Sequence, residues 1–95
     1  MSKFVLIFRG GAPSSQEEGE KMMVDWTAWL GGMGDAVLDA GEAVGTSQFI
    51  GAKSDPVSGY MKIDAADMDA AMAHAQKCPI LTLGGSIEIA PALEM

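Results

Sequence analysis

The run KFVLIFR at residues 3–9 constrains the fold more than any other stretch of this 95-residue chain. It is continuously apolar between its charged ends and rich in residues that favour strands, which is typical of a central strand covered on both faces. Alternation divides its side chains between two faces, with Lys3, Val5, Ile7 and Arg9 on one and Phe4, Leu6 and Phe8 on the other. We therefore expect a β-sheet with this strand inside it and with Arg9 closing one face.

A helix is predicted from Ser15 to Met33. Ser15 followed by Glu18 has the spacing of a capping box, and acidic residues in a first turn suit the helix dipole. Apolar side chains recur along one side of the helix, namely Met22, Trp26, Trp29 and Met33, broadened by Met23 and Leu30. Glycines at 31, 32 and 34 then weaken the helix and end it.

A second helix is predicted to begin with Asp67 as its N-cap. The side chains expected on its buried face are Met68, Ala71, Met72 and Ala75. This helix must stop at Cys78, because Pro79 disfavours a helical conformation at the residue before it. Gly84-Gly85 then gives the backbone freedom to turn, and SIEIAPALEM (86–95) forms the last strand.

The stretch between the helices is predicted to hold two strands. Residues 35–45 are ambiguous in propensity, and their shortness and flanking glycines favour an extended segment. Residues 46–50 (TSQFI) continue it as the second strand, and residues 51–59 form a turn-rich loop. Residues 60–64 alternate between polar and apolar, as in a half-buried strand that pairs with the preceding one as a hairpin.

The predicted order is therefore β-α-β-β-α-β, the ferredoxin-like plan of the α+β class. One domain spans residues 1–95, with a four-stranded antiparallel sheet and both helices on one of its faces. The other face of the sheet is left bare. An apolar bare face on so short a chain predicts a homodimer formed through that face.

Composition and charge exclude several classes of function. The net charge is −7, and only six Lys and Arg residues are scattered along the chain, whereas nucleic acids and anionic membranes are bound by clustered bases. The single Cys makes no internal disulfide, and the lack of a CxxC or Cys/His cluster predicts no metal site and no cofactor. The Cys usage favours a cytoplasmic location, and no apolar run approaches the length of a membrane span.

The segment GYMKIDAADMDAAMAHAQKCPILTLGGSIEIAPALEM (59–95) resembles the C-terminal half of the YCII-related domain family, also called DGPF. The shared features are the Gly-Tyr strand, the Asp-capped Ala-rich helix, Cys-Pro, Gly-Gly and an ending in Pro-x-x-Glu-Met. KFVLIFRG and WTAWLGGMGDAVLDAG also look like that family, so the resemblance covers nearly the whole chain. It implies a dimeric ferredoxin-like α/β barrel.

Two departures from the family pattern weaken what the resemblance implies about chemistry. SDPVSG stands where the family's longer loop carries the DGPF tetrapeptide. Related members carry a His on a helix followed by an Asp, which together form a polar site, but the first helix here has no His. Trp26 and Trp29 occupy that region, and Asp39 is the best match to the family Asp. Most members of the family have no established reaction.

The residues considered for a site are Arg9, Trp26, Trp29, Asp39 and Tyr60. The two Trp side chains either wall a pocket for an apolar or planar ligand or pack the helix onto the sheet. Arg9 either holds a carboxylate or enolate bidentately or pairs with Glu88 or Asp39. Asp39 is either a general base whose pKa burial raises or a turn residue. Tyr60 either donates to a ligand or packs at the dimer face.

Two functions fit these residues. The first is a noncatalytic dimeric module that binds a small organic ligand in a pocket lined by Trp and Arg, which the missing helix His favours. The alternative is a cofactor-independent isomerase or lyase for a small organic acid. In it Arg9 orients the anion, Asp39 moves a proton and the Trp pair excludes water. His74 is expected to be solvated or to face the helix C-terminus, and Cys78 to be a small buried thiol.

Overall fold

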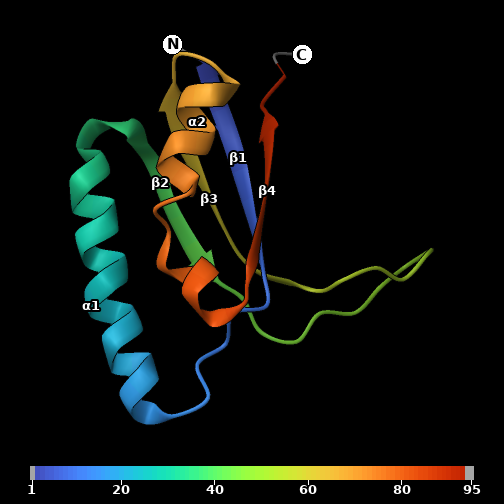
Figure 1. The fold of residues 1–95 in the computed structure, drawn as a ribbon. Coiled ribbons are helices and arrows are strands. Elements are labelled where there is room, and N and C mark those ends of the chain that lie inside the picture. Colours follow the sequence, from blue (N-terminus) through green and yellow to red (C-terminus); the bar gives the residue numbers. More distant parts are fainter. Residues whose placement is uncertain (1, 94–95) are drawn as a thin grey trace.

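The structure, a computed structural model, describes residues 2–93 and confirms the β-α-β-β-α-β order (Figure 1). The strands are β1 (Ser2–Arg9), β2 (Val37–Ala43), β3 (Val57–Ala65) and β4 (Ser86–Pro91), and the helices are α1 (Gln16–Met33) and α2 (Met68–Ala75). Short 3-10 helices, η1 (Gly34–Ala36) and η2 (Pro79–Leu83), follow α1 and α2. The strand order β2-β3-β1-β4, with antiparallel neighbours throughout, is that of the ferredoxin-like fold.

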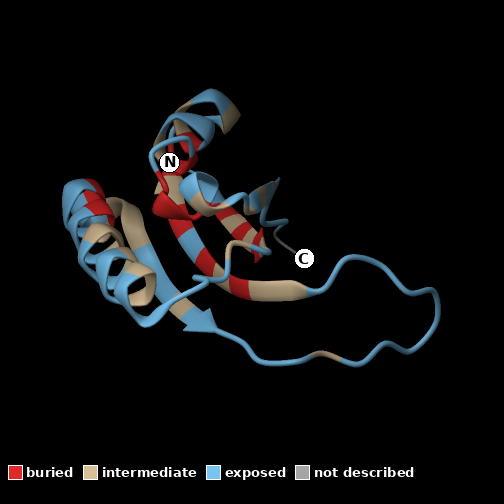
Figure 2. Cartoon of the chain, turned by 60° about the horizontal axis from the view of Figure 1, so that its bottom comes forward, coloured by how far each residue is buried: buried red, intermediate tan, exposed pale blue. Residues whose placement is uncertain are grey.

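Strand β1 lies inside the sheet, as its apolar sequence predicts, and pairs with β3 on one side and β4 on the other. Its side chains alternate in burial: Phe4, Leu6 and Phe8 are buried, whereas Val5 and Ile7 are only half-buried. Helices α1 and α2 both cover the side of the sheet that carries the buried residues (Figures 1 and 2). The core is therefore one layer between helices and sheet, completed by Trp29, Met33, Met61, Ile63, Ala65, Ala71, Ala75, Cys78 and Ile80.

Helix α1 begins where its capping signal predicts. The Ser15 hydroxyl accepts a hydrogen bond from the Glu18 amide at 3.1 Å. The Glu18 carboxylate bonds one residue further back than in a capping box, accepting from the Ser14 amide at 2.9 Å and the Ser14 hydroxyl at 3.0 Å. Those two bonds hold the pKa of Glu18 below its ordinary value. The first turn of α1 is thus fixed by two serines and one acid.

The predicted apolar stripes of the two helices are correct except for two methionines. Trp29 and Met33 are buried, and Met22, Trp26 and Leu30 pack against the core. Met23, however, is 69% exposed and Met72 is 43% exposed, so neither belongs to the buried core. Each is next in sequence to a residue that packs against the core. The apolar stripe of each helix therefore covers fewer positions than the number of apolar residues in that helix indicates.

The stops and turns around α2 come in the predicted order, although α2 already ends at Ala75 and β4 ends at Pro91. Residues 94–95 of the predicted last strand lie outside the described residues. The Asp67 carboxylate accepts from the Ala70 amide at 2.9 Å and caps the helix. Pro79 opens η2, where its missing amide costs no hydrogen bond. Gly84 has a φ of 78°, and a Cβ on Gly85 would lie 2.6 Å from Cγ1 of Ile80. The glycine pair therefore serves both a left-handed turn and a close packing contact.

The extended segment predicted at residues 35–45 is confirmed, because it holds β2, but its predicted continuation through residues 46–50 is wrong. Strand β2 lies earlier, in the segment of ambiguous propensity, and its pairing with β3 ends where Ala43 faces Gly59. A strand needs a neighbour to satisfy its backbone, and no strand of the described chain runs beside TSQFI, so strand-forming residue types alone do not make it one. Residues 44–56, called the arm below, carry no helix or strand, and β3 begins at Val57 rather than at Tyr60.

The side of the sheet opposite the helices, called the open face below, is bare in the single chain, as predicted. Alternation and strand register place on it Lys3, Val5, Ile7, Arg9, Asp39, Glu42, Tyr60, Lys62, Asp64, Glu88 and Ala90. The expectation that this face is apolar is right only for a strip formed by Val5, Ile7 and Ala90. Charged residues of both signs surround that strip.

Candidate ligand-binding cavity

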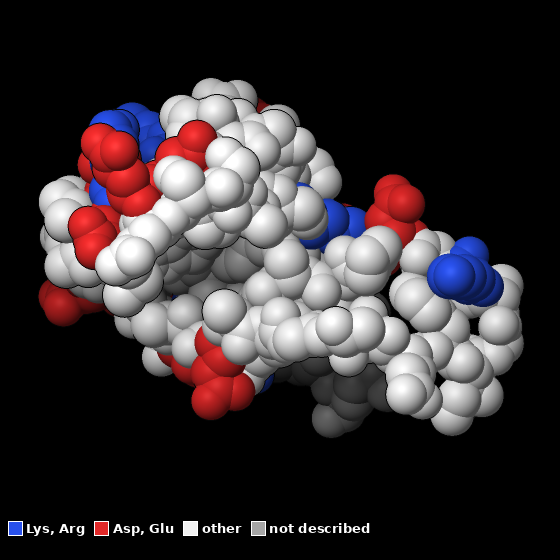
Figure 3. All heavy atoms as spheres, turned by 90° about the horizontal axis from the view of Figure 1, so that it is seen from below, with Lys and Arg blue, Asp and Glu red and all other residues white. Residues whose placement is uncertain are grey.

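A cavity of about 540 Å³ opens between α1, the loop after β1 and the end of the β2–β3 hairpin. Most of its wall is apolar, contributed by Phe8, Pro13, Met22, Met23, Trp26 and Leu30, while Glu42, Ser58 and Tyr60 are the polar residues along its border. Figure 3 looks at this end of the molecule, where the surface is hollowed and mostly uncharged atoms border the hollow. The cavity thus has the size and the apolar character of a small-molecule site.

Aromatic rings build one wall of the cavity. The ring of Trp26 lies edge-on to Phe8, with centroids 5.2 Å apart and planes at 72°. Trp29 packs edge-on behind Trp26 at 5.2 Å and is only 8% exposed. Its indole Nε1–H donates to the backbone oxygen of His74 at 2.9 Å, which ties α1 to α2. Trp26 therefore lines the cavity, and Trp29 holds Trp26 in place from the core side.

The loop after β1 forms a second wall, and glycine allows its path. Gly10 and Gly11 have φ values of 67° and 72°, in the left-handed region that favours glycine. A Cβ on Gly11 would lie 2.3 Å from Cγ1 of Ile80, so any larger residue would push the loop off η2. The Ser58 hydroxyl donates to the Gly10 carbonyl at 3.1 Å and links this loop to β3.

The third wall is the bulged end of β2. The register of β2 against β3 shifts between Asp39 and Glu42, and Gly41 lies there with a φ of 68°. The Asp39 carboxylate accepts from the Gly41 amide at 2.9 Å, a local bond typical of an aspartate in a turn. Asp39 is exposed and is not among the residues that line the cavity. Its visible role is to fix the bulge.

Arg9 lies on the open face and has two partners there. Its Nη1 is 2.7 Å from Oε1 of Glu88, and its Nε donates to the Asp55 carbonyl at 3.3 Å. Pairing with Glu88 was one of the two interpretations of Arg9, and the structure confirms that pair. Arg9 is not among the lining residues, so within one chain it holds the arm and β4 rather than a ligand in the cavity.

Tyr60 borders the cavity, but its phenol lies on the other side of the sheet. Its register opposite Ile7 directs the side chain to the open face, where the hydroxyl donates to Oε2 of Glu42 at 3.3 Å. The negative charge of Glu42 is the main reason that the pKa of Tyr60 lies above its ordinary value. The phenol is therefore protonated at neutral pH, and the contribution of Tyr60 to the cavity is its backbone.

The cavity thus unites few of the five residues considered from the sequence. Trp26 lines it with its ring, and Tyr60 lines it only with its backbone. Arg9, Asp39 and Trp29 lie outside the lining. Neither of the two cavities described among residues 2–93 is lined by both a Trp and Arg9.

The sequence interpretation did not single out several lining residues. Met22 and Leu30 belong to the predicted apolar stripe of the first helix, and residues 10–13 form the loop between β1 and α1. The available signal was the combination of a glycine pair and a proline directly after a central strand, since loops at strand ends often carry binding residues. Met23 was also informative, because an exposed methionine near a Trp suits an adaptable apolar wall.

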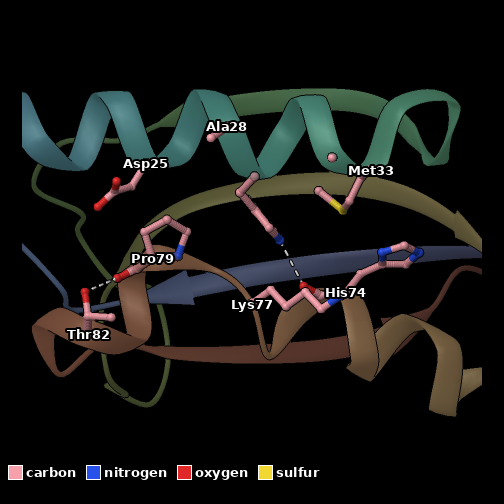
Figure 4. A pocket seen from close by; sticks show the side chains of 9 residues that line it. Asp25, Ala28, Met33, His74, Lys77, Pro79 and Thr82 are labelled. Carbon is pink, nitrogen blue, oxygen red and sulfur yellow. Dashed lines mark hydrogen bonds between the residues drawn. The ribbon is translucent and has the colours of Figure 1, made fainter.

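A second cavity of about 510 Å³ lies between α1 and the α2–η2 segment (Figure 4). Its polar groups bond mostly within the chain. The Thr82 hydroxyl donates to the Pro79 carbonyl at 2.7 Å, and the Asp25 carboxylate is 3.1 Å from Nζ of Lys21. The Trp29 indole and the His74 carbonyl satisfy each other, as the dashed line in Figure 4 marks. This cavity is the weaker candidate for a ligand.

Two remaining expectations concern Cys78 and His74. Cys78 is 2% exposed, as predicted for a buried thiol, and burial raises its pKa to about 11. His74 is half-buried in the last turn of α2. Within residues 2–93, no three His, Cys, Asp or Glu side chains gather closely enough to hold a metal ion. None of the helices in that range combines the length and hydropathy needed to cross a membrane.

Comparisons with protein-family models and with curated protein sequences give no significant match. Among solved structures, the fold is similar to that of 5-chloro-2-hydroxyhydroquinone dehydrochlorinase (TftG) from Burkholderia phenoliruptrix AC1100, in complex with 2,5-dihydroxybenzoquinone. The TM-score is 0.58 and the sequence identity 16%, over 90% of each chain. The likeness therefore supports the ferredoxin-like fold over nearly the whole chain, and at this identity it assigns no role to any residue.

Proposed function

We propose that this protein binds a small, uncharged, preferably aromatic compound in the cavity beside Trp26. The composition of the cavity wall carries the proposal: its rings and methionines are apolar, and none of the described residues that line it is Lys, Arg or His. Burying an anion without a cationic partner is costly, so this wall disfavours a carboxylate. The Ser58 hydroxyl, which donates to Gly10, keeps lone pairs that can accept from a phenolic hydroxyl.

The same geometry favours binding over the proton-transfer alternative. An isomerase or lyase for an organic acid needs Arg9 and Asp39 at one ligand. Arg9 bonds Glu88 and the arm, Asp39 bonds the Gly41 amide, and neither lines the cavity. A general base must come within hydrogen-bond reach of the proton that it removes, and the Asp39 carboxylate, which already accepts from the Gly41 amide, is not among the groups that line this cavity.

Family and ligand class are consistent with the comparison. Membership of the YCII-related family, which the sequence resemblance implies, belongs to this proposal and accords with the ferredoxin-like fold. The similar dehydrochlorinase is in complex with a small ring compound, 2,5-dihydroxybenzoquinone. A ring of that size is of the kind expected beside Trp26, since flat rings pack favourably on or against an indole.

A homodimer formed through the open face is the second part of the proposal. The charges support it: the open face holds three basic residues, Lys3, Arg9 and Lys62, against four acidic ones, Asp39, Glu42, Asp64 and Glu88. This nearly neutral surface is the part of a −7 chain on which two copies meet with little repulsion. Light scattering at micromolar concentration should give twice the chain mass, and a purely monomeric mass would contradict the dimer.

The ligand proposal is tested with two probes that differ mainly in charge, 4-methylphenol and benzoate. In two-dimensional NMR spectra, 4-methylphenol should shift the indole N–H signal of Trp26 more than that of Trp29, and benzoate should shift neither. Calorimetric titration then gives the affinities. Equal binding of both probes, or no binding of 4-methylphenol at millimolar concentration, would contradict the proposed ligand class.

Two variants locate the binding site. Trp26→Ala removes the aromatic wall and should weaken 4-methylphenol binding by at least about tenfold. Val24→Ala is the matched control, because Val24 is on the same helix, is 69% exposed and does not line the cavity. An unchanged affinity in Trp26→Ala, with the fold intact by circular dichroism, would remove the cavity from the proposal.

A further inference from the structure

The arm, residues 44–56, is the least expected part of the fold. It leaves the end of β2, extends away from α1 and returns to β3 without forming a helix or strand (Figures 1 and 2). Connections longer than about 12 residues without secondary structure are uncommon in compact domains and are usually functional. A hairpin could join the same two strands with far fewer residues. The length of the arm therefore indicates a function other than joining β2 to β3.

Little within the chain holds the arm in place. Among residues 2–93, no backbone-to-backbone hydrogen bond involves residues 45–56, and the only bond recorded to that stretch is from Arg9 to the Asp55 carbonyl. The Ser47 hydroxyl oxygen is excluded from solvent and has no hydrogen-bond partner in this part of the chain. An ordered, extended segment needs contacts that offset its lost conformational freedom. The described residues of a single chain supply few such contacts in the form of hydrogen bonds.

The tip of the arm carries large apolar side chains. Ile50 is 104% exposed, the highest value of any large hydrophobic residue described, and its neighbour Phe49 is 37% exposed. Apolar side chains that project together on a protrusion mark an interaction surface more than a single exposed residue does. Lys53 and Asp55 balance each other in charge, so the arm as a whole is neutral.

The arm is continuous with the open face. Arg9, which lies on that face and pairs with Glu88, is the residue that bonds the Asp55 carbonyl at the base of the arm. A copy of the chain placed on the open face therefore lies next to the arm. Both surfaces are nearly neutral, which suits a second copy of the same acidic chain. The arm has the extended form and apolar tip of an element that reaches across a two-fold interface.

We propose that the arm is an intersubunit clasp, in which Phe49 and Ile50 of one copy pack against the surface of the other. This inference rests on the open-face dimer proposed above and adds a residue-level contact to it. The two can fail separately: a dimer whose stability does not depend on the arm contradicts only the clasp, and a monomer contradicts both.

The first test measures the dimer dissociation constant by sedimentation equilibrium. The variant Phe49→Ser/Ile50→Ser removes the apolar tip and should raise the dissociation constant by at least about tenfold. Val24→Ser/Met72→Ser is the matched control, because it also removes two exposed apolar side chains but on the helix side of the sheet. It should leave the dissociation constant unchanged. Circular dichroism confirms that both variants fold.

The second test detects the contact directly and does not depend on a loss of stability. Ile50→Cys adds one exposed thiol to a chain whose own Cys78 is buried and has a pKa raised to about 11, so a maleimide-linked photo-crosslinker labels the arm alone. Illumination should give a covalent dimer, with the crosslinked peptide identified by mass spectrometry in the other copy. Val24→Cys, labelled in the same way, should not.

The outcomes separate the clasp from its rivals. A dimeric Ile50→Cys protein whose label crosslinks only within its own chain would show that the arm folds over its own subunit, and would overturn the proposal. A dimeric protein with no crosslink and an unchanged dissociation constant in Phe49→Ser/Ile50→Ser would overturn it as well. A crosslinked dimer together with a weakened association would establish the clasp.

Discussion

Replacing Gly41 is a sensitive test of the β2–β3 geometry, because three features of this position together favour a glycine. It has a φ of 68°, it lies at the register shift of β2, and a Cβ placed on it would lie 1.7 Å from the Tyr60 carbonyl oxygen. No real Cβ approaches another heavy atom so closely, and the atom in question belongs to the backbone of β3 rather than to a flexible side chain. Gly41→Ala must therefore push the two strands apart.

The size of the effect follows from these contacts. A residue with a Cβ in the left-handed region costs roughly 1–2 kcal/mol. Separating β2 from β3 also weakens the flanking backbone hydrogen bonds, each of which contributes about 1 kcal/mol net. We expect Gly41→Ala to lower the free energy of unfolding by about 3 kcal/mol or more. Because 1 kcal/mol shifts the Tm of a domain of this size by about 4–8 °C, the Tm should fall by at least about 12 °C.

Thermal unfolding followed by circular dichroism measures this shift, with Gly31→Ala as the matched control. Gly31 is in α1, has no atom within 4 Å of its would-be Cβ and has no left-handed φ. Alanine there should stabilise the protein by about 0.5–1 kcal/mol, since glycine disfavours a helix interior. A Gly41→Ala protein that unfolds within a few degrees of the parent would refute the bulge geometry and the cavity wall built on it.

Three further predictions concern individual side chains. Asp39→Asn keeps an acceptor for the Gly41 amide and should leave urea stability nearly unchanged, whereas Asp39→Ala should lose about 0.5–1.5 kcal/mol; equal losses would argue against the bond. Glu88→Gln should cost at most about 1 kcal/mol, and 0.5 M salt should remove that difference, because the Arg9–Glu88 pair is partly exposed. For Cys78, burial raises the pKa from 9.0 to about 11, so between these pH values the unfolded thiol ionises first and stability falls. Urea unfolding should show a larger loss over this pH range in the parent than in Cys78→Ala, where the raised pKa of Tyr60 still contributes.

The sequence predicts well those parts of the fold that depend on local signals. Ser15 and Asp67 cap the two helices through contacts within a few residues, as predicted, and Pro79 opens η2 after α2 has ended at Ala75. The alternation in residues 3–9 correctly identifies the central strand and its buried face. These features need no knowledge of distant segments, because capping, proline geometry and side-chain alternation are properties of short stretches.

The predicted continuation of the second strand through residues 46–50 is wrong because the end of that strand depends on a distant partner. TSQFI has residue types that favour strands, whereas propensity alone is ambiguous for DAVLDAGEA, which is rich in Ala and Leu. The latter becomes β2 because its bulge at Gly41 lets it follow β3, a register that only the assembled sheet determines. TSQFI therefore lies in the arm, where the apolar side chain of Phe49 is partly exposed and that of Ile50 is fully exposed.

Two correct local predictions, the alternation of side chains along β1 and the apolar stripe of α1, together decide which residues can line the candidate site. Alternation along β1 assigns Arg9 to the face opposite Phe8, whereas the stripe of α1 that carries Trp26 must pack on the Phe8 side. The sheet itself therefore stands between the Arg9 side chain and Trp26, and Arg9 is not among the residues that line the cavity beside Trp26. A single subunit therefore has an apolar cavity on the helix side of the sheet and a surface of mixed charge on the open face. An anion-binding role for Arg9 is consistent with this division only in an assembly in which another copy frees Arg9 from Glu88. Measuring the salt dependence of the Arg9–Glu88 pair in the dimer and in a monomeric variant shows whether the pair persists in the open-face dimer.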